Sequence, residues 1–248
     1  MEVRMILRRR WLWFAAVAVI AVAAFAAWPG VVHRGRALDG GEVSLEKLDV
    51  YGEVPDFSLV ERGGRRVGRG DLLGKVWVLD FIYTECTETC PVQSLQFARL
   101  QRDFAASDLR LVSITVDPQH DTPGVLQRYA ERYGADRERW LFITGDKHQI
   151  YCLAKDGFHL SVVDQGDPNP PPCGRMAATS DAWSAVTRFV APPAFATHGS
   201  QGLLMHSSRV VLVDRRGRIR AYHQAIDDES LARLRSNLRS LLSERSGP

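Results

Sequence analysis

One stretch, residues 76–91 (VWVLDFIYTECTETCP), constrains the fold of this chain more than any other. Residues 76–83 are rich in β-branched and aromatic side chains, which predicts a buried β-strand. A polar turn that carries Cys86 and Cys90 follows, and a proline comes directly after it. Because proline suits the first position of a helix, we expect Cys90 to be the N-cap residue of a helix that runs to about Ala106.

The two thiols lie where a strand meets a helix N-terminus, and the field of the helix favours the thiolate form there. Such a site is typical of soft-metal binding or of thiol redox chemistry. On a regular helix, residues four apart are about 5–6 Å apart at Cβ, whereas a disulfide needs roughly 3.5–4.5 Å. We therefore expect the loop to deform when Cys86 and Cys90 switch between a dithiol and a disulfide. The placement predicts exposed sulfurs, and a structural disulfide or an unpaired buried thiol is the alternative.

Two acidic residues, Glu85 and Glu88, flank the thiols. Their negative charge opposes deprotonation of a neighbouring thiol. We expect this charge to offset part of the helix effect and to leave the pair with moderate thiolate character.

The N-terminal region predicts the compartment. Residues 11–28 form an uninterrupted apolar run that is just long enough to span a bilayer, and four arginines precede it. Positive charge before a span keeps the N-terminus in the cytoplasm, so the cysteines would be exported to an oxidising space. A signal peptide cleaved near residues 24–26 is the alternative. We favour a retained single-pass anchor in a bacterial inner membrane, with the C-terminal domain in the periplasm. The predicted organisation is a cytoplasmic N-terminus (1–10), a transmembrane anchor (11–29), a tether (30–50) and a folded domain (51–248).

Beyond this anchor the chain alternates strands and helices. Residues 164–201 interrupt the alternation with several prolines, and we expect an inserted surface excursion with a short helix near residues 182–189. The order, with a thiol pair after the first long strand, describes an α/β thioredoxin-like fold in which helices flank a central mixed sheet. The other expected elements are strands at 54–59, 109–116 and 140–144, helices beginning after Thr122 and Asp146, a hairpin at 209–214 and 218–222, and a final helix at 228–242.

Composition argues against two classes of protein. The formal net charge of +3 over 248 residues is too small and too scattered to indicate nucleic-acid binding. Four cysteines are too few for a disulfide scaffold of this length. Cys152, which we expect in a short helix as a buried thiol, and Cys173, in the proline-rich excursion, could pair with each other in an oxidising compartment.

Four motifs together resemble the Sco/SenC family. They are Asp56-Phe57, the stretch 80–91 with its Cys-x-x-x-Cys-Pro, residues 115–118 with 121–123, and His206 shortly before a Val-Leu-Val-Asp strand. The resemblance covers residues 54–242. It implies a membrane-anchored copper-binding protein that helps assemble the dinuclear copper centre of cytochrome c oxidase. Two features depart from the family pattern, namely Met205 where many members have an acidic residue, and the length of the 164–201 excursion.

The resemblance also implies a ligand set. Two thiolates and one imidazole suit copper, so we expect Cys86, Cys90 and His206 to bind Cu(I) or Cu(II). His120 and His198 are the rival histidines. Asp117 and Asp121 are either turn-forming residues or residues that hold the cysteine loop and tune the histidine.

Two functions from different classes remain open. The first is a copper chaperone that passes copper to the copper-receiving subunit of cytochrome c oxidase at the membrane surface. The second is a membrane-anchored thiol–disulfide oxidoreductase that reduces cysteines of the apo copper subunit or of another target. In that reaction Cys86 would attack and Cys90 would resolve. A thiol peroxidase is disfavoured because no arginine falls within residues 84–91.

Overall fold

The computed structural model describes residues 45–164, 169–173, 203–205 and 208–244 of the chain. The apolar run 11–28, the helix expected near 182–189, His198 and His206 lie outside these residues. Within the described part of the chain, no helix is both long enough and apolar enough to cross a membrane.

From β4 (Trp77–Ile82) onward the elements of the main sheet follow the expected order, whereas the strand expected at 54–59 was wrong in its bounds and is found as β2 at Ser58–Glu61. The strands of the main sheet are β1 (Gly52–Glu53), β2 (Ser58–Glu61), β3 (Arg66–Gly68), β4 (Trp77–Ile82), β5 (Arg110–Thr115), β6 (Trp140–Thr144), β9 (Arg209–Val213) and β10 (Arg218–Gln224). The helices are α2 (Arg69–Leu72), α3 (Thr89–Asp103), α4 (Pro123–Arg132), α5 (Lys147–Cys152) with the π-helical turn η1 (Leu153–Gly157), and α7 (Asp228–Ser243).

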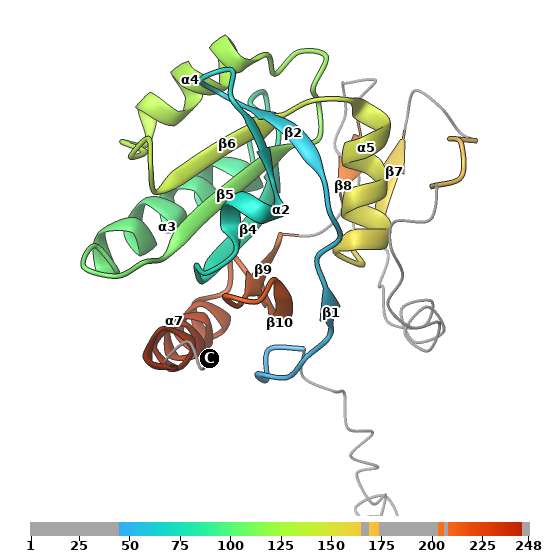
Figure 1. Cartoon of the computed structure of the whole chain (residues 1–248). Helices are drawn as coiled ribbons and strands as arrows, with labels where there is room; N and C mark the ends of the chain where they lie inside the picture. Colours follow the sequence, from blue (N-terminus) through green and yellow to red (C-terminus); the bar gives the residue numbers. More distant parts are fainter. Residues whose placement is uncertain (1–44, 165–168, 174–202, 206–207, 245–248) are drawn as a thin grey trace, which may run out of the picture. The chain divides into compact units, whose positions relative to one another are not determined.

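The sheet is mixed, with the strand order β1-β10-β9-β4-β5-β6-β2-β3. The central strands β4, β5 and β6 are parallel, and the remaining pairs are antiparallel. Figure 1 shows α3 and α7 on one side of the sheet and α5 on the other. The prediction of a mixed sheet flanked by helices is confirmed.

All six residues of β4 are buried. Because successive side chains of a strand point in opposite directions, both faces of this strand are covered. Trp77, Leu79 and Phe81 join the apolar cluster that includes α5. Val78 and Ile82 join the other cluster, to which α3, α4 and α7 contribute their buried faces. Burying a large apolar side chain contributes about 1.5–3 kcal/mol, so these two layers hold the central strand and the loop that follows it in place.

The start of α3 differs from the prediction. The helix begins at Thr89 with Glu88 as its N-cap residue, so Cys90 lies inside the first turn, and the helix ends at Asp103 rather than near Ala106. The physical reason lies in Cys86, whose sulfur accepts a hydrogen bond from the backbone N–H of Cys90 at 3.4 Å. This sulfur satisfies one of the N–H groups that a helix start leaves without a partner. Phe97 and Leu100 of α3, and Phe104 directly after it, are buried, so this face of the helix packs into the domain.

Other boundaries agree with the sequence signals. Strand β6 matches the predicted range 140–144, and α4 begins at Pro123 after Thr122 as its N-cap residue. Asp146 caps α5 by accepting a hydrogen bond from the backbone N–H of Gln149 at 2.8 Å. Gly134 follows α4 with a positive φ of 62°, a conformation that glycine adopts at little cost.

The ends of the predicted excursion are joined. Strand β7 (Val162–Asp164) pairs antiparallel with β8 (Leu203–Met205), and Val162 lies opposite Met205. The excursion therefore leaves and re-enters the domain at one two-stranded ladder.

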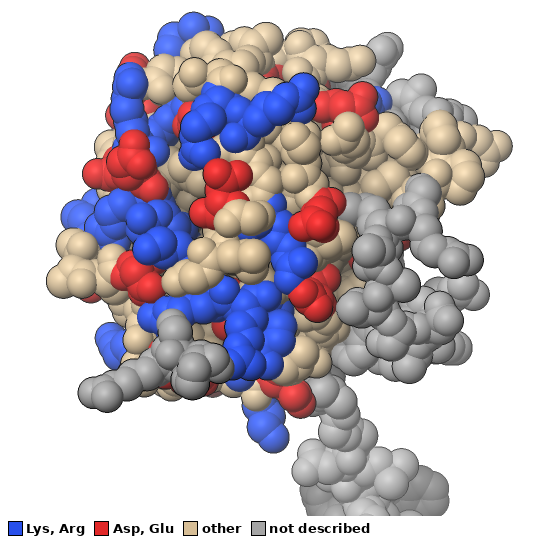
Figure 2. All heavy atoms as spheres, in the orientation of Figure 1, with Lys and Arg blue, Asp and Glu red and all other residues tan. Residues whose placement is uncertain are grey.

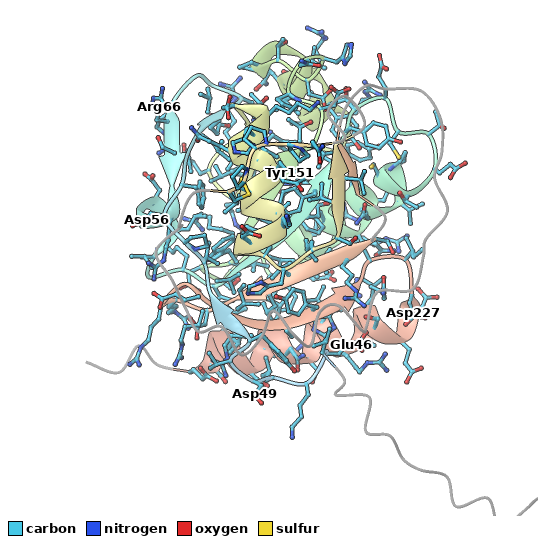
Figure 3. The ribbon with its side chains drawn as sticks, turned by 90° about the vertical axis from the view of Figure 1, so that its right-hand side faces the viewer. Glu46, Asp49, Asp56, Arg66, Tyr151 and Asp227 are labelled. Carbon is cyan, nitrogen blue, oxygen red and sulfur yellow. A yellow bond between two sulfur atoms is a disulfide. The ribbon has the colours of Figure 1, made fainter. Side chains whose placement is uncertain are left out.

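Residues 45–50, which fall within the predicted tether, contact the folded domain. The carbonyl of Leu45 accepts a hydrogen bond from Tyr222 of β10 at 2.8 Å, and the backbone N–H of Asp49 donates to Arg220 at 3.1 Å. The carboxylate of Glu46 accepts a hydrogen bond from Ser230 of α7 at 2.5 Å and pairs with Arg233. Figure 3 shows Glu46 and Asp49 beside this edge of the domain, with Asp227 at the start of α7.

Charged side chains of both signs are interspersed on the surface. Figure 2 shows lysines and arginines next to acidic side chains over one face of the domain. Several of them form ion pairs, including Arg215 with Asp108 and Arg65 with Asp71, both at 3.1 Å.

Candidate metal and redox site

Asp121 fixes the beginning of the cysteine loop. Its carboxylate accepts hydrogen bonds from the backbone N–H and the hydroxyl of Thr84, at 3.0 and 2.5 Å, and from the hydroxyl of Thr115 at 2.5 Å. Burial raises the pKa of Asp121, and the hydrogen bonds from the two threonines counteract part of that effect. Of the two roles left open by the sequence, Asp121 therefore makes the contacts of a residue that holds the loop.

Both cysteines are buried, which corrects the expectation of exposed sulfurs. Only 8% of Cys86 and 4% of Cys90 is exposed, and both are free thiols. They pack in the same apolar cluster as Ile82 at the end of β4 and Phe97 of α3. The neighbouring residues 87–89 are exposed, so the loop lies at the surface while its two cysteine side chains point inward, a direction that a strand–turn–helix pattern alone does not reveal.

The two thiols differ sharply in acidity. The Cys90 thiol donates a hydrogen bond to Cys86 and, together with backbone N–H groups of the helix start, lowers the pKa of Cys86 to about 4. The same hydrogen bond, followed by burial, raises the pKa of Cys90. At neutral pH the pair therefore holds one thiolate, on Cys86, and one proton, on Cys90. The expectation of moderate thiolate character was wrong, because direct hydrogen-bond donors set the pKa of Cys86 and the charges of Glu85 and Glu88 are not among its main causes.

Asp80 is a feature of the site that the sequence reasoning assigned no role. It lies on β4, on the face that carries Val78 and Ile82, and it is fully buried. Among the described residues no group meets the full geometry of a hydrogen bond to either carboxylate oxygen, and Ser113, opposite Asp80 on β5, counteracts only part of the effect of burial. Burial raises the pKa of Asp80 to about 7, and its charge contributes to the raised pKa of Cys90. One acidic residue within an otherwise apolar strand was the sequence signal that could have revealed it.

His120 and Asp117 form a pair at the rim of the site. Nδ1 of His120 lies 2.8 Å from a carboxylate oxygen of Asp117, and this hydrogen bond is the main reason why the pKa of His120 is raised. Glu85 of the cysteine loop raises the pKa of His120 further. The imidazole is exposed, whereas Asp117 is buried. His120 thus faces the charged edge of the loop, while its ring is engaged by Asp117.

The third expected ligand, His206, lies between β8 and β9 and outside the described residues. The sheet register places the start of β9, which follows His206 in the sequence. Strand β9 pairs antiparallel with β4, with Val213 opposite Trp77 and Val211 opposite Leu79. The start of β9 is therefore at the end of β4 from which the cysteine loop departs. In the part of the chain that the structure describes, no three His, Cys, Asp or Glu side chains come together as a metal site.

Comparison with known proteins settles the family. The family model for SCO1/SenC matches residues 47–179, more than half of the chain. The chain belongs to the SCO1/SenC family. The SCO1 protein homolog of Bacillus subtilis is 36% identical over 118 residues, which cover 47% of this chain and 60% of the relative. A putative copper-binding protein of Stutzerimonas stutzeri is 30% identical over 167 residues, which cover 65% of this chain and 79% of the relative.

Solved structures of SCO1/SenC proteins share the fold. A SCO1/SenC family lipoprotein from Bacillus anthracis superposes with a TM-score of 0.58 at 23% identity, covering 77% of this chain and 95% of that one. ScoI of Bradyrhizobium japonicum, solved with copper bound, superposes with a TM-score of 0.53 at 20% identity, covering 77% and 99%. These likenesses support the thioredoxin-like prediction for the described domain.

Proposed function

We propose that this chain is a copper chaperone that delivers copper to the dinuclear copper centre of cytochrome c oxidase. The observation that carries the proposal is the pair of free thiols Cys86 and Cys90 at the start of α3, where hydrogen bonds from the Cys90 thiol and backbone N–H lower the pKa of Cys86 and favour its thiolate. A thiolate is the form of cysteine that binds metal. Two sulfurs and an imidazole from His206 form a soft donor set that suits copper.

The family supports the same function. The relative from Stutzerimonas stutzeri is described as a putative copper-binding protein. A structural neighbour is described as a member of the Sco family of cytochrome c oxidase assembly proteins. Copper would be the cargo of this chain, and an oxidase subunit that receives copper would be its partner.

Copper binding would displace the proton that Cys90 holds. In the dithiol this proton joins Cys90 to Cys86, so both sulfurs become ligands only when the proton leaves. Metal binding to thiols releases protons and depends on pH for this reason. We expect close to one proton to be released per copper at neutral pH, because Cys86 has already lost its own.

The test is a titration of the reduced chain with Cu(I) and with Cu(II). We expect one copper per chain at this site and a sulfur-to-copper charge-transfer band with Cu(II). His206→Ala should weaken Cu(II) binding more than Cu(I) binding, because two thiolates alone can hold Cu(I). His120→Ala and His198→Ala are the matched controls. Unchanged copper affinity in a Cys86→Ser, Cys90→Ser double variant would refute the assignment.

Thiol–disulfide exchange is the second candidate, and the unequal acidity of the two thiols favours it. The Cys86 thiolate would attack a substrate disulfide, and one substrate sulfur would leave with the electron pair. Cys90, after losing its proton, would then attack Cys86 and release the second substrate sulfur, which leaves the Cys86–Cys90 disulfide. The substrate gains two electrons, and the chain loses two. His206→Ala separates the two candidates, since it should reduce copper affinity and leave the exchange rate nearly unchanged.

We also propose that residues 11–29 anchor the chain in the inner membrane with residues 51–248 in the periplasm. The apolar run and the arginines before it support this location. Retention in the membrane fraction after carbonate washing is the expected result. Release of a soluble form that begins near Ala27 would support cleavage instead.

A further inference from the structure

A second pair of cysteines lies in the other apolar layer of the domain. Cys152 and Cys173 form a disulfide, so the pairing left open from the sequence is confirmed, and the expectation that Cys152 is a thiol is wrong. This disulfide belongs to the cluster that covers the α5 side of the sheet, whereas Cys86 and Cys90 belong to the cluster on the α3 side. The two pairs are therefore separated by the sheet, and the Cys152–Cys173 disulfide calls for an account of its own.

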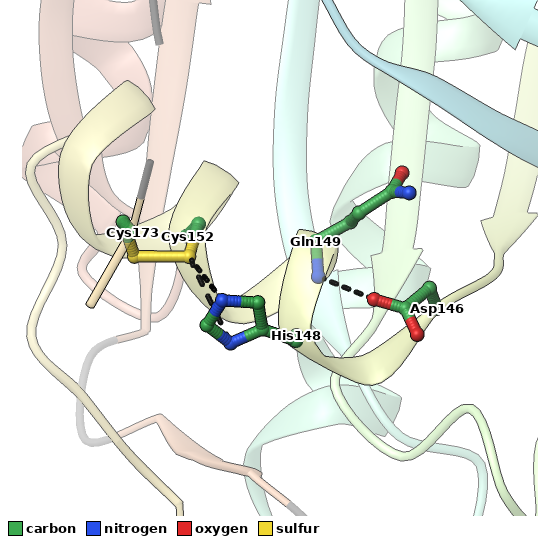
Figure 4. The surroundings of a disulfide bond; sticks show 5 residues. All are labelled: Asp146, His148, Gln149, Cys152 and Cys173. Carbon is green, nitrogen blue, oxygen red and sulfur yellow. Dashed lines mark hydrogen bonds between the residues drawn. A yellow bond between two sulfur atoms is a disulfide. The ribbon is translucent and has the colours of Figure 1, made fainter. Parts of the chain in front are cut away.

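A histidine is placed against one sulfur of this disulfide. Nε2 of His148 lies 3.5 Å from Sγ of Cys152, and Nδ1 lies 4.0 Å away. His148 and Cys152 are four residues apart on α5, a spacing that puts side chains on the same face of a helix. The imidazole also stacks on Tyr151, with ring centroids 6.3 Å apart and planes 16° apart. Figure 4 shows the ring of His148 next to Cys152, while Gln149 points away from the disulfide.

The two half-cystines differ in exposure and in their partners. Cys152 is buried, with 6% of its surface exposed, and the buried residues Leu153 and Ala154 of η1 follow it directly. Cys173 is only partly buried, and the exposed residues Pro171 and Pro172 precede it. A nucleophile from solvent therefore reaches Cys173 more readily. The sulfur that would then leave is that of Cys152, on which the imidazole lies.

We propose that Cys152, Cys173 and His148 form a second thiol–disulfide exchange site, whose reductant is a dithiol. A thiolate of the dithiol attacks Sγ of Cys173, the Cys152–Cys173 bond breaks, and Cys152 leaves with the electron pair. An imidazole N–H of His148 donates a hydrogen bond to the departing thiolate, and a thiol whose thiolate is stabilised leaves faster. The second thiol of the reductant, as its thiolate, then releases Cys173. The disulfide gains two electrons and, from the two thiols of the reductant, two protons, and the dithiol becomes a disulfide.

This arrangement gives His148 the part of a positioning residue for the leaving sulfur rather than of a nucleophile. It also gives the reaction a direction, because the mixed disulfide forms on Cys173 and the free thiol appears on Cys152. A disulfide with a purely structural role has no need of either property. Unequal exposure alone already directs attack to Cys173, so the measurement that separates the two roles is the loss of rate and of direction when the imidazole is removed.

The experiment uses the full-length chain in detergent with Cys86→Ser and Cys90→Ser, so that only one disulfide can react. Reduction by dithiothreitol is followed by quenched alkylation and mass spectrometry. Glutathione, a monothiol, is used in parallel to trap the mixed disulfide, which is located by peptide mapping. Variants His148→Ala and Gln149→Ala are compared, and the thermal midpoint of each oxidised variant shows whether it folds.

We expect His148→Ala to slow reduction roughly three- to tenfold, while Gln149→Ala reduces at the parent rate. Glutathione should be found on Cys173, and this preference should weaken in His148→Ala. Equal reduction rates in the two variants, or trapping mainly on Cys152, would overturn the proposal. A disulfide that dithiothreitol leaves intact in the folded chain would overturn it as well. If His148→Ala does not fold, His148→Phe, which keeps a ring against Tyr151 but offers no N–H, replaces it, and a reduction rate equal to that of the parent would overturn the proposal.

Discussion

Replacement of Asp80 by asparagine should stabilise the fold at neutral pH, and the gain should depend on pH. Asp80 is fully buried, no group among the described residues meets the full geometry of a hydrogen bond to its carboxylate, and burial raises its pKa from the ordinary 3.8 to about 7. When the pKa of an acid is higher in the folded chain than in the unfolded chain, the acid lowers the free energy of unfolding at every pH above its unfolded pKa. The penalty is absent below about pH 3.8, grows as pH rises, and is complete above about pH 7. The difference between the two pKa values corresponds to a loss of unfolding free energy on the order of 4 kcal/mol.

Urea unfolding between pH 4 and 8.5 measures this effect. The parent for the comparison carries Cys86→Ser and Cys90→Ser, so that the thiols do not titrate. We expect the free energy of unfolding of Asp80→Asn, relative to this parent, to increase by about 4 kcal/mol from pH 4 to pH 8. Burying an unpaired amide adds a cost that does not depend on pH. The change with pH therefore isolates the carboxylate.

Asp214→Asn is the control, because the Asp214 carboxylate stabilises the fold at neutral pH whereas the Asp80 carboxylate destabilises it. Burial alone would raise the pKa of Asp214, but hydrogen bonds from Arg218 and Arg220 hold it below the ordinary value. This substitution should destabilise the fold at neutral pH, and the loss should shrink as pH falls through the folded pKa. If the difference in unfolding free energy between Asp80→Asn and its parent stays constant from pH 4 to 8, the reasoning about the buried carboxylate is refuted.

Three further outcomes follow from the contacts at the cysteine loop. Cys90→Ala should raise the pKa of Cys86 above 4, because the Cys90 thiol is the main donor to it; thiolate absorbance against pH checks this, and an unchanged titration would contradict it. Asp121→Ala should lower the free energy of unfolding by about 2 kcal/mol, since it leaves the partly buried backbone N–H of Thr84 and the hydroxyls of Thr84 and Thr115 without their acceptor, and should weaken copper binding roughly tenfold or more. Urea unfolding and copper competition measure both effects, with Asp56→Ala, at an exposed side chain, as the control. The oxidised Cys86–Cys90 form should bind essentially no copper at this site, because copper and the disulfide require the same two sulfurs; tight stoichiometric binding to oxidised chain, with the disulfide verified by mass, would show that the ligands lie elsewhere.

The sequence by itself determined the elements and the kind of chemistry. Strand β6 was predictable from a short run of apolar residues, and helix α4 from a capping residue followed by a proline, because these signals act within a few residues of one another. The pair Cys86 and Cys90 was identifiable for the same reason, since its position after a buried strand is a local pattern. The motifs also placed the chain in its family, which the comparison confirmed.

Only the tertiary structure decided how the site is built. Asp121 reaches Thr84 across 37 residues of sequence, and the direction in which the two cysteine side chains point depends on packing between β4 and α3. The separation of the Cys86 and Cys90 pKa values follows from one hydrogen bond between their sulfurs, and the raised pKa of Asp80 follows from the layers that exclude water around it. Such effects depend on distances between groups that no local periodicity encodes. The role of His206 as a ligand stays a prediction from the sequence, supported by the register that brings the start of β9 to the end of β4.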